Sequence, residues 1–190
     1  MHFPLKTELY RKLIHILGLL FIPLLYYSRE LTLMLCISLI PLYLIEEYLF
    51  RKELELGGLI TFFQKCKRPH EADIFILDPI FMVVGVFIAV FFYPLTAAAC
   101  AIFQVSLADA GAAIVGIQWG HRKLPWSSQK TWEGTFVFFA IAFLGSLLFF
   151  DWQTALILAG TGTVLEQIPI KGIDNLTIPV GVGVVAMLLM

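Results

Sequence analysis

Charged residues are scarce in this sequence of 190 residues. Asp, Glu, Lys and Arg make up 14% of the chain, whereas 59% of the residues are apolar and the mean hydropathy is +0.88. Soluble domains are about a quarter charged, so this composition predicts a protein that lies in lipid rather than one with a larger core. The net charge of −1 indicates no nucleic-acid partner, because such binding needs clustered positive charge.

Cysteine is rare as well. Cys36, Cys66 and Cys100 are scattered, and no CxxC or Cys/His cluster predicts a zinc site. The sequence also lacks a GxxxxGK[ST] phosphate loop, the HRD and DFG motifs of protein kinases, and a Ser/His/Asp set for acyl transfer. These absences exclude the common soluble kinase and hydrolase classes.

Seven apolar segments are long enough, or nearly so, to cross a membrane. A membrane helix needs about 20 mostly apolar residues, and the candidate spans cover residues 8–28, 30–50, 76–93, 94–117, 132–150, 153–168 and 175–190. The sequence predicts an all-α fold, a polytopic transmembrane helix bundle of about seven spans, with one catalytic domain over residues 1–190. The connector at 51–74 is expected to lie at the cytoplasmic interface. The short last span invites a partner, such as a second copy in a homodimer.

Positive charges are distributed unevenly over the loops of this arrangement. Of the 13 Lys and Arg residues, Arg29 alone falls on the side opposite to the others. Loops rich in Lys and Arg stay in the cytoplasm, so the N-terminus is expected inside and the C-terminus outside. The chemically capable side chains would then collect at the cytoplasmic face of an integral membrane protein.

The first of three polar blocks lies in the first span. Glu8, Arg11, Lys12 and His15 are spaced so that they share one face of a helix. Such a stripe could be a solvated overhang whose charges reach water. His15 lies a turn deeper, however, beside Leu, Ile and Phe residues. A polar stripe that enters a membrane helix more often faces the bundle interior, so we expect the stripe to face other helices.

The second block, SLADAGAAIVGIQWGHRKLPWSSQKTWEGT at 106–135, places a carboxylate inside a span. An Asp within a membrane helix costs roughly 2.5–3.5 kcal/mol on insertion scales, so Asp109 is expected to be functional. Small residues follow on the same face, including Gly116 and Gly120. These two glycines alone would fit close helix packing equally well, but packing does not explain Asp109.

A basic loop follows this span. It combines positive charges with hydroxyl groups: His121, Arg122, Lys123, Ser127, Ser128 and Lys130. This mixture suits a polyphosphate, and the alternative is a topology signal that faces anionic lipid. Thr131 or a neighbour is expected to cap the next helix, whose N-terminus would present N–H groups to the same space. Gly134 allows close approach, and Glu133 is either a first-turn acid or a Mg²⁺ ligand.

The third block, VLEQIPIKGIDNLTIPVG at 164–181, brings further oxygen atoms to the same face. Glu166 lies near the end of the sixth span, and Asp174 and Asn175 open the seventh. These residues either cap the helix or bind Mg²⁺, which prefers carboxylates, phosphate and water. For Asp78, which opens the third span, capping is the preferred interpretation. Carboxylates and a basic loop at a membrane surface favour phosphoryl or nucleotidyl transfer to a lipid.

These three blocks together resemble the CTP-dependent membrane lipid kinases, which include dolichol kinase, phytol kinase and a diacylglycerol kinase. ELYRKLIH at 8–15 is similar to their E-x-x-RK-x-x-H helix. ADAGAAIVGIQWGHRKLP…KTWEGT resembles their central D-x-x-A-x-x-x-G-x-x-x-G-x-x-K-x-P…K-[ST]-x-x-G block, and EQIPIKGIDNLTIP at 166–179 resembles their E…D-[DN]-N-L-T-[IV]-P block. Many relatives carry Gly at the position of Ala108, just before Asp109. This difference affects the local backbone and leaves the predicted site unchanged.

The resemblance implies a reaction and roles for the residues. CTP with Mg²⁺ would phosphorylate a membrane lipid alcohol, of the polyprenol or dolichol kind, and release CDP. Asp109, Asp174 and Lys130 would be catalytic. Metal ligands are expected among Asp109, Glu133, Glu166 and Asp174. The nucleotide is expected to be bound by Arg11, Lys12, His15, Gly116, Gly120, Lys123, Lys130, Thr131, Gly134 and Asn175.

Two other functions remain open. KTWEG at 130–134 is also typical of phosphatidate cytidylyltransferase, which uses CTP to make a CDP-lipid and pyrophosphate. The C-terminal K-D…HGG…D-R-x-D pattern of that enzyme is absent, and DNLTIP stands in its place. A small membrane transporter is the other alternative, because an intramembrane Asp beside helix ends also suits ion coupling.

Overall fold

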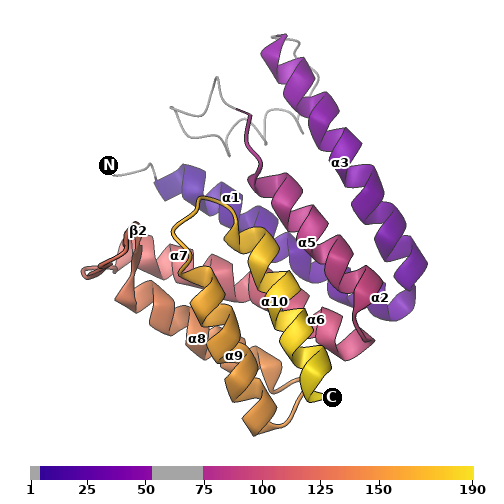
Figure 1. The fold of residues 1–190 in the computed structure, drawn as a ribbon. Helices are drawn as coiled ribbons and strands as arrows, with labels where there is room; N and C mark the ends of the chain where they lie inside the picture. Colours follow the sequence, from indigo (N-terminus) through magenta and orange to yellow (C-terminus); the bar gives the residue numbers. More distant parts are fainter. Residues whose placement is uncertain (1–4, 53–74) are drawn as a thin grey trace.

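The computed structural model describes residues 5–52 and 75–190, and these are helical apart from one short hairpin (Figure 1). The first half comprises α1 (Leu5–Leu17), the 3-10 segment η1 (Gly18–Leu20), α2 (Phe21–Tyr27), α3 (Arg29–Arg51) and α5 (Asp78–Phe92). The second half comprises α6 (Leu95–Phe103), the π-helical η3 (Gln104–Ala108), α7 (Asp109–Gln118), β1 (Lys123–Leu124), β2 (Ser127–Thr131), α8 (Trp132–Ser146), α9 (Trp152–Glu166) and α10 (Asp174–Leu189).

The helices agree with the predicted apolar segments to within a few residues at most boundaries. Three stretches of the described chain are long and apolar enough to cross a membrane: Lys6–Tyr27, Arg29–Arg51 and Leu95–Gln118. Three apolar helices are shorter: Asp78–Phe92, Trp132–Ser146 and Asp174–Leu189. The all-helical bundle is therefore confirmed, whereas the number of seven spans stays a prediction. The 51–74 connector lies outside the described residues except for its first two.

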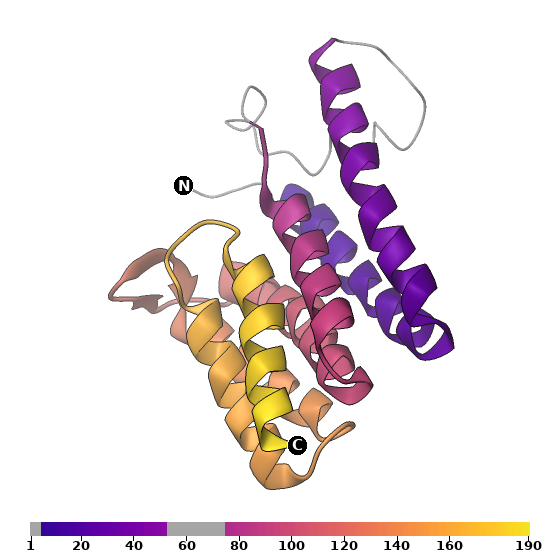
Figure 2. The ribbon, with the colours of Figure 1, turned by 45° about the vertical axis from the view of Figure 1, so that its right-hand side comes forward.

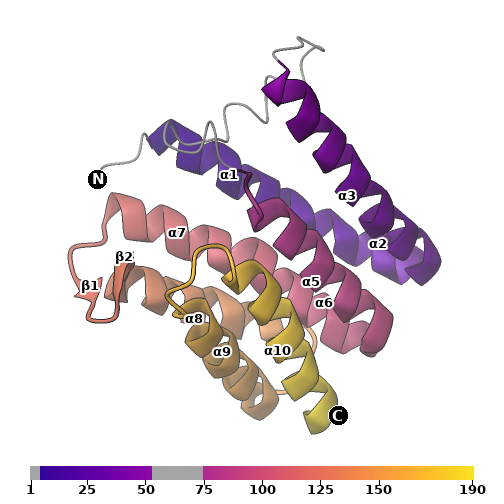
Figure 3. The ribbon, with the colours of Figure 1, turned by 45° about the horizontal axis from the view of Figure 1, so that its top comes forward.

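Helices α1 and α2 form one continuous stretch, as do α6 and α7, and successive stretches run in alternating directions, so their ends gather at two opposite ends of the bundle. The start of α1, the β1–β2 hairpin and the α9–α10 connection share one end, which we call the polar end, and the C-terminus lies at the other (Figures 1 and 3). Helix α3 lies at the side of the bundle, against α5 and α2 (Figure 2). Much of its apolar surface is exposed, as expected for a helix that faces lipid.

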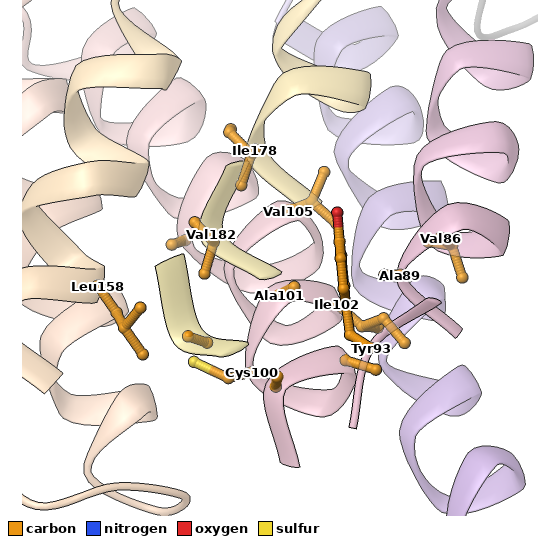
Figure 4. Close-up of a cluster of buried hydrophobic side chains, with 14 of the residues drawn as sticks. Val86, Ala89, Tyr93, Cys100, Ala101, Ile102, Val105, Leu158, Ile178 and Val182 are labelled. Carbon is orange, nitrogen blue, oxygen red and sulfur yellow. The ribbon is translucent and has the colours of Figure 1, made fainter. Parts of the chain in front are cut away.

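The core lies around α6, which is built from small residues. Ala97, Ala98 and Ala101 are fully buried, and small side chains let neighbouring helices approach closely. Larger apolar residues from α5, α9 and α10 surround them (Figure 4). Polar contacts cross this core, among them a hydrogen bond that Gln104 Nε2 donates to Ser146 Oγ at 3.1 Å. The segment from α6 to α7 is thereby fixed at the centre of the bundle.

Close packing of this core predicts a contrast between two glycines. A Cβ atom on Gly145 would run into the ring of Phe103, whereas a Cβ atom on Gly160 would meet nothing within 4 Å. We expect Gly145→Ala to destabilise the protein by about 1–3 kcal/mol, because overpacking forces side chains to shift. Gly160→Ala should leave stability unchanged or slightly higher. Thermal unfolding in detergent measures both, and equal stability of the two variants would contradict this packing.

Candidate active site

Asp109 is buried at the start of α7 and is held by two side chains from α1. Its Oδ2 atom lies 2.6 Å from Lys12 Nζ and 3.0 Å from His15 Nδ1. His15 Nδ1 also lies 3.4 Å from the backbone oxygen of Val105, in the π-helical segment just before Asp109. The prediction that the polar stripe of α1 faces the bundle interior is therefore confirmed. Residues 97 positions apart in the chain meet at one carboxylate.

Lys130, at the end of the hairpin, binds two further carboxylates. Its Nζ atom lies 2.7 Å from Glu166 Oε1 and 2.7 Å from Asp174 Oδ2, and it also donates to the backbone oxygen of Glu166. Burial alone would lower the pKa of Lys130, but the negative charges of Asp174 and Glu166 outweigh burial and raise this pKa above its ordinary value. Asp109 acts on Lys130 electrostatically in the same direction.

The raised pKa fixes the charge state of this lysine. When folding raises the pKa of a group, the protonated group stabilises the folded protein. This stabilisation is complete below the pKa of the group in the unfolded chain, and it is lost as the pH rises through the pKa in the folded protein. The unfolded pKa of lysine is about 10.4. Lys130 is therefore a permanent cation at physiological pH, suited to binding phosphate and unsuited to acting as a base.

A third contact joins α1 to α5 and α10. Arg11 forms an ion pair with Asp78, and Asn175 Nδ2 donates to the backbone oxygen of Asp78 at 3.2 Å. The capping interpretation of Asp78 was wrong, because the α5 N-cap is Leu77 and has no side-chain cap bond. Gly172, with φ of +72°, lies so close that a Cβ atom there would run into Asp78 Oδ1. The sequence did contain a signal for this role, because Asp78 is a carboxylate at the same end of the spans as the three polar blocks.

Asp174 does not cap α10 either. The N-cap of α10 is Ile173, which has no side-chain cap bond. Asp174 instead contacts Lys130 through Oδ2 and accepts from the backbone N–H of Asn175 through Oδ1 at 3.1 Å. Its carboxylate therefore belongs to the lysine-centred group. We call Lys12, His15, Asp109, Lys130, Glu166 and Asp174 together the polar cluster.

The glycines and Thr131 lie where α7, β2 and α8 pack together. Thr131 caps α8, with its Oγ1 atom accepting from the N–H of Gly134 at 3.1 Å, as predicted. A Cβ atom added to Gly116 would lie 3.0 Å from Thr131 Oγ1, and one added to Gly134 would lie 2.8 Å from the backbone oxygen of Ala112. On Gly120 it would clash with Gly116 and Thr131. These glycines allow close backbone packing here, and their expected part in nucleotide binding stays a prediction.

The basic loop is a two-stranded antiparallel hairpin, a feature that its composition did not predict. Lys123 is paired in register with Thr131, and its side chain is exposed. Glu133 accepts hydrogen bonds from the backbone N–H groups of His121 at 3.1 Å and Arg122 at 3.3 Å. Its carboxylate thus holds the first strand of the hairpin near the N-terminus of α8. A metal-binding role for Glu133 stays a prediction.

The donor atoms of the polar cluster suit a hard divalent cation. Asp109, Glu166 and Asp174 supply carboxylate oxygens, which Mg²⁺ prefers. Glu166 Oε2 is buried without a hydrogen-bond partner among the described residues. Within the same residues, no three His, Cys, Asp or Glu side chains are already gathered in a metal-binding group. A cation bound here would therefore share these carboxylates with Lys130.

Curated proteins similar to this chain are phytol kinases. A phytol kinase of Synechocystis is 36% identical over 99 residues, which cover 47% of this chain and 42% of that protein. Probable chloroplastic phytol kinases of Glycine max and Zea mays are each 33% identical over 103 residues, which cover 45% of this chain. The chain thus spans less than half the length of these relatives. They support the resemblance to the CTP-dependent lipid kinases.

No protein-family model matches the chain, and no solved structure matches it.

The buried pair between Lys12 and Asp109 generates a test of the site's architecture. Lys12→Met leaves a buried carboxylate without its main counter-charge, and breaking such a pair costs about 3–5 kcal/mol. The double variant Lys12→Met/Asp109→Asn removes both charges and should recover most of this loss. Thermal or denaturant unfolding in detergent measures the stability of the wild-type protein, the two single variants and the double variant. If the double variant were as unstable as the sum of the two single variants, the pairing would be wrong.

Proposed function

We propose that this chain is a CTP-dependent kinase that phosphorylates the hydroxyl group of an isoprenoid lipid alcohol and releases CDP. The observation that carries the proposal is the polar cluster itself. Residues of all three motif blocks, at 8–15, 106–135 and 164–181, meet around Asp109 and Lys130. The relatives named phytol kinase support the same reaction class.

In this proposal the positive side chains bind the nucleotide phosphates. Lys130 remains charged at physiological pH, as its raised pKa indicates. The exposed side chain of Lys123 on β1 would meet the nucleotide from solvent. Arg11 and Lys12 add positive charge from α1, and His15 adds a ring nitrogen. Phosphoryl transfer is catalysed mainly by positioning and by charge neutralisation, so a buried set of paired charges is a suitable scaffold.

Mg²⁺ would be held by Asp109 and Asp174, with Glu166 as the third carboxylate. When bound, it would neutralise negative charge on the phosphate oxygens. The unpartnered Oε2 atom of Glu166 supports this proposal, because a buried carboxylate oxygen without a partner is costly.

The reaction balances without any further reactant. The alcohol oxygen attacks the γ-phosphorus of CTP, and the bond from that phosphorus to the β–γ bridging oxygen breaks. CDP leaves with the electron pair of that bond. The proton of the hydroxyl group passes to a carboxylate, for which we propose Asp109. Its contacts with Lys12 and His15 orient it for this role.

The orientation in the membrane is part of the same proposal. The polar end carries the positive loops, and loops rich in Lys and Arg stay on the cytoplasmic side. The N-terminus would be inside, and CTP would reach the polar cluster from the cytoplasm. The alcohol would approach from the inner leaflet, with its apolar chain in lipid and its hydroxyl group at the cluster.

Product analysis tests the proposal. Purified protein should transfer label from [γ-³²P]CTP to a lipid alcohol in the presence of Mg²⁺, with CDP as the second product. We expect phytol and a short polyprenol or dolichol to be accepted better than diacylglycerol. Pyrophosphate together with a CDP-lipid would instead identify a cytidylyltransferase. No turnover of CTP with any lipid would contradict the proposal.

Two variants make this assay specific to the cluster. Asp109→Asn keeps the shape of the side chain but removes its charge, and it should lower turnover by at least about 10²-fold, the usual scale of acid–base catalysis. Lys52→Gln removes an exposed lysine at the end of α3 and serves as the matched control. Near-normal turnover of a well-folded Asp109→Asn variant would remove Asp109 from the mechanism.

A further inference from the structure

Thr135, on α8, has a buried hydroxyl group that no atom of residues 5–52 and 75–190 satisfies. The residue is 8% exposed, and its Oγ1 atom has no hydrogen-bond partner among the described residues. An unsatisfied buried hydroxyl is costly, on the order of 1–3 kcal/mol. Such a group in a native structure calls for a partner, which the described part of the chain does not supply.

Other helix threonines of this chain show what is unusual about Thr135. A threonine in a membrane helix ordinarily bonds back to the carbonyl four residues earlier. Four threonines do so here, at 2.7–3.1 Å: Thr32, Thr161, Thr163 and Thr177. The Thr135 hydroxyl makes no such bond, so its donor hydrogen is available to a bound molecule.

Helix geometry places Thr135 at the level of the polar cluster. Gly134, next to Thr135, packs against α7, because a Cβ atom on Gly134 would lie 2.8 Å from the backbone oxygen of Ala112. Ala112 is about one helical turn from Asp109, towards the polar end. One turn further along α8, the ring of Phe138 lies against Gly162 of α9. Thr135 is therefore at the level where α8 meets α7 and α9, towards the polar end from Phe138.

This level is the boundary between the polar cluster and the apolar core. Phe138 is fully buried one turn below Thr135, and Lys130 and its carboxylates lie towards the polar end. An amphiphile that presents a hydroxyl group to the cluster must keep its apolar chain on the other side of such a boundary. At this boundary, the hydroxyl group of Thr135 can donate a hydrogen bond to the oxygen of such an alcohol.

We propose that Thr135 positions the acceptor: its Oγ1–H donates a hydrogen bond to the hydroxyl oxygen of the lipid alcohol. That bond leaves the alcohol's own proton free to point towards Asp109. This inference rests on the proposed kinase function, because it assigns the acceptor subsite of the same reaction. Thr135 is a positioning residue, and the phosphates of the nucleotide do not depend on it.

Kinetics separate this role from a structural one. Thr135→Val has nearly the same shape without the hydroxyl group, and it should raise the KM for the lipid alcohol about tenfold, as one hydrogen bond would. The KM for CTP should stay unchanged. Thr135→Ser should retain the wild-type KM within about twofold. Thr163→Val is the matched control, because its hydroxyl already bonds to Ala159, and it should change neither constant.

A binding experiment without turnover keeps this inference distinct from the kinase proposal. Phytol should raise the unfolding temperature of the wild-type protein more than phytane, the hydrocarbon that lacks the hydroxyl group. In Thr135→Val this difference should disappear, and in Thr135→Ser and Thr163→Val it should persist. If Thr135→Val keeps the difference, or weakens CTP and alcohol equally in the kinetic assay, the assignment is overturned. An inactive protein that shows the hydroxyl-dependent difference would refute the kinase proposal alone.

Discussion

Charges buried in an apolar bundle must be paired, and this requirement governs how the chain is arranged. Removing a charge from water costs several kcal/mol unless a partner offsets it. Lys130 meets this requirement by binding Glu166 and Asp174 together, and Lys12 meets it by binding Asp109. These pairs join the hairpin to α9 and α10, and α1 to α7. The polar end is therefore tied together by charge, whereas the rest of the bundle is held by apolar packing.

The centre of the bundle serves this arrangement. Alanines in α6 let neighbouring helices approach, and the hydrogen bond from Gln104 to Ser146 fixes the chain just before the π-helical segment. π-helical turns often mark functional sites. Here the segment ends directly before Asp109 and brings the backbone oxygen of Val105 to His15. The irregular turn thus sits where α1 meets the carboxylate.

Periodicity and hydropathy were sufficient to predict the helices, because each helix is encoded by residues close together in the sequence. They also predicted that the α1 stripe faces inward and that Thr131 caps α8. The partners of the charges could not be predicted, since Lys130 and Asp174 are 44 positions apart. Asp78 was misread for the same reason: capping is a local explanation, whereas its ion pair with Arg11 spans 67 positions. The unsatisfied hydroxyl group of Thr135 likewise depends on how α8 packs against other helices.

In the proposed function, the lysine-centred part of the polar cluster binds the phosphates of a nucleotide. A ligand that binds the native state raises its unfolding temperature, and the rise grows with the affinity and the concentration of the ligand. The most direct measurement is therefore the shift in unfolding temperature caused by CTP at a constant Mg²⁺ concentration, each protein compared with its own form without CTP. We expect a clear upward shift for the wild-type protein and little or none for Lys130→Met. A shift of equal size in both proteins would mean that Lys130 does not bind the nucleotide phosphates.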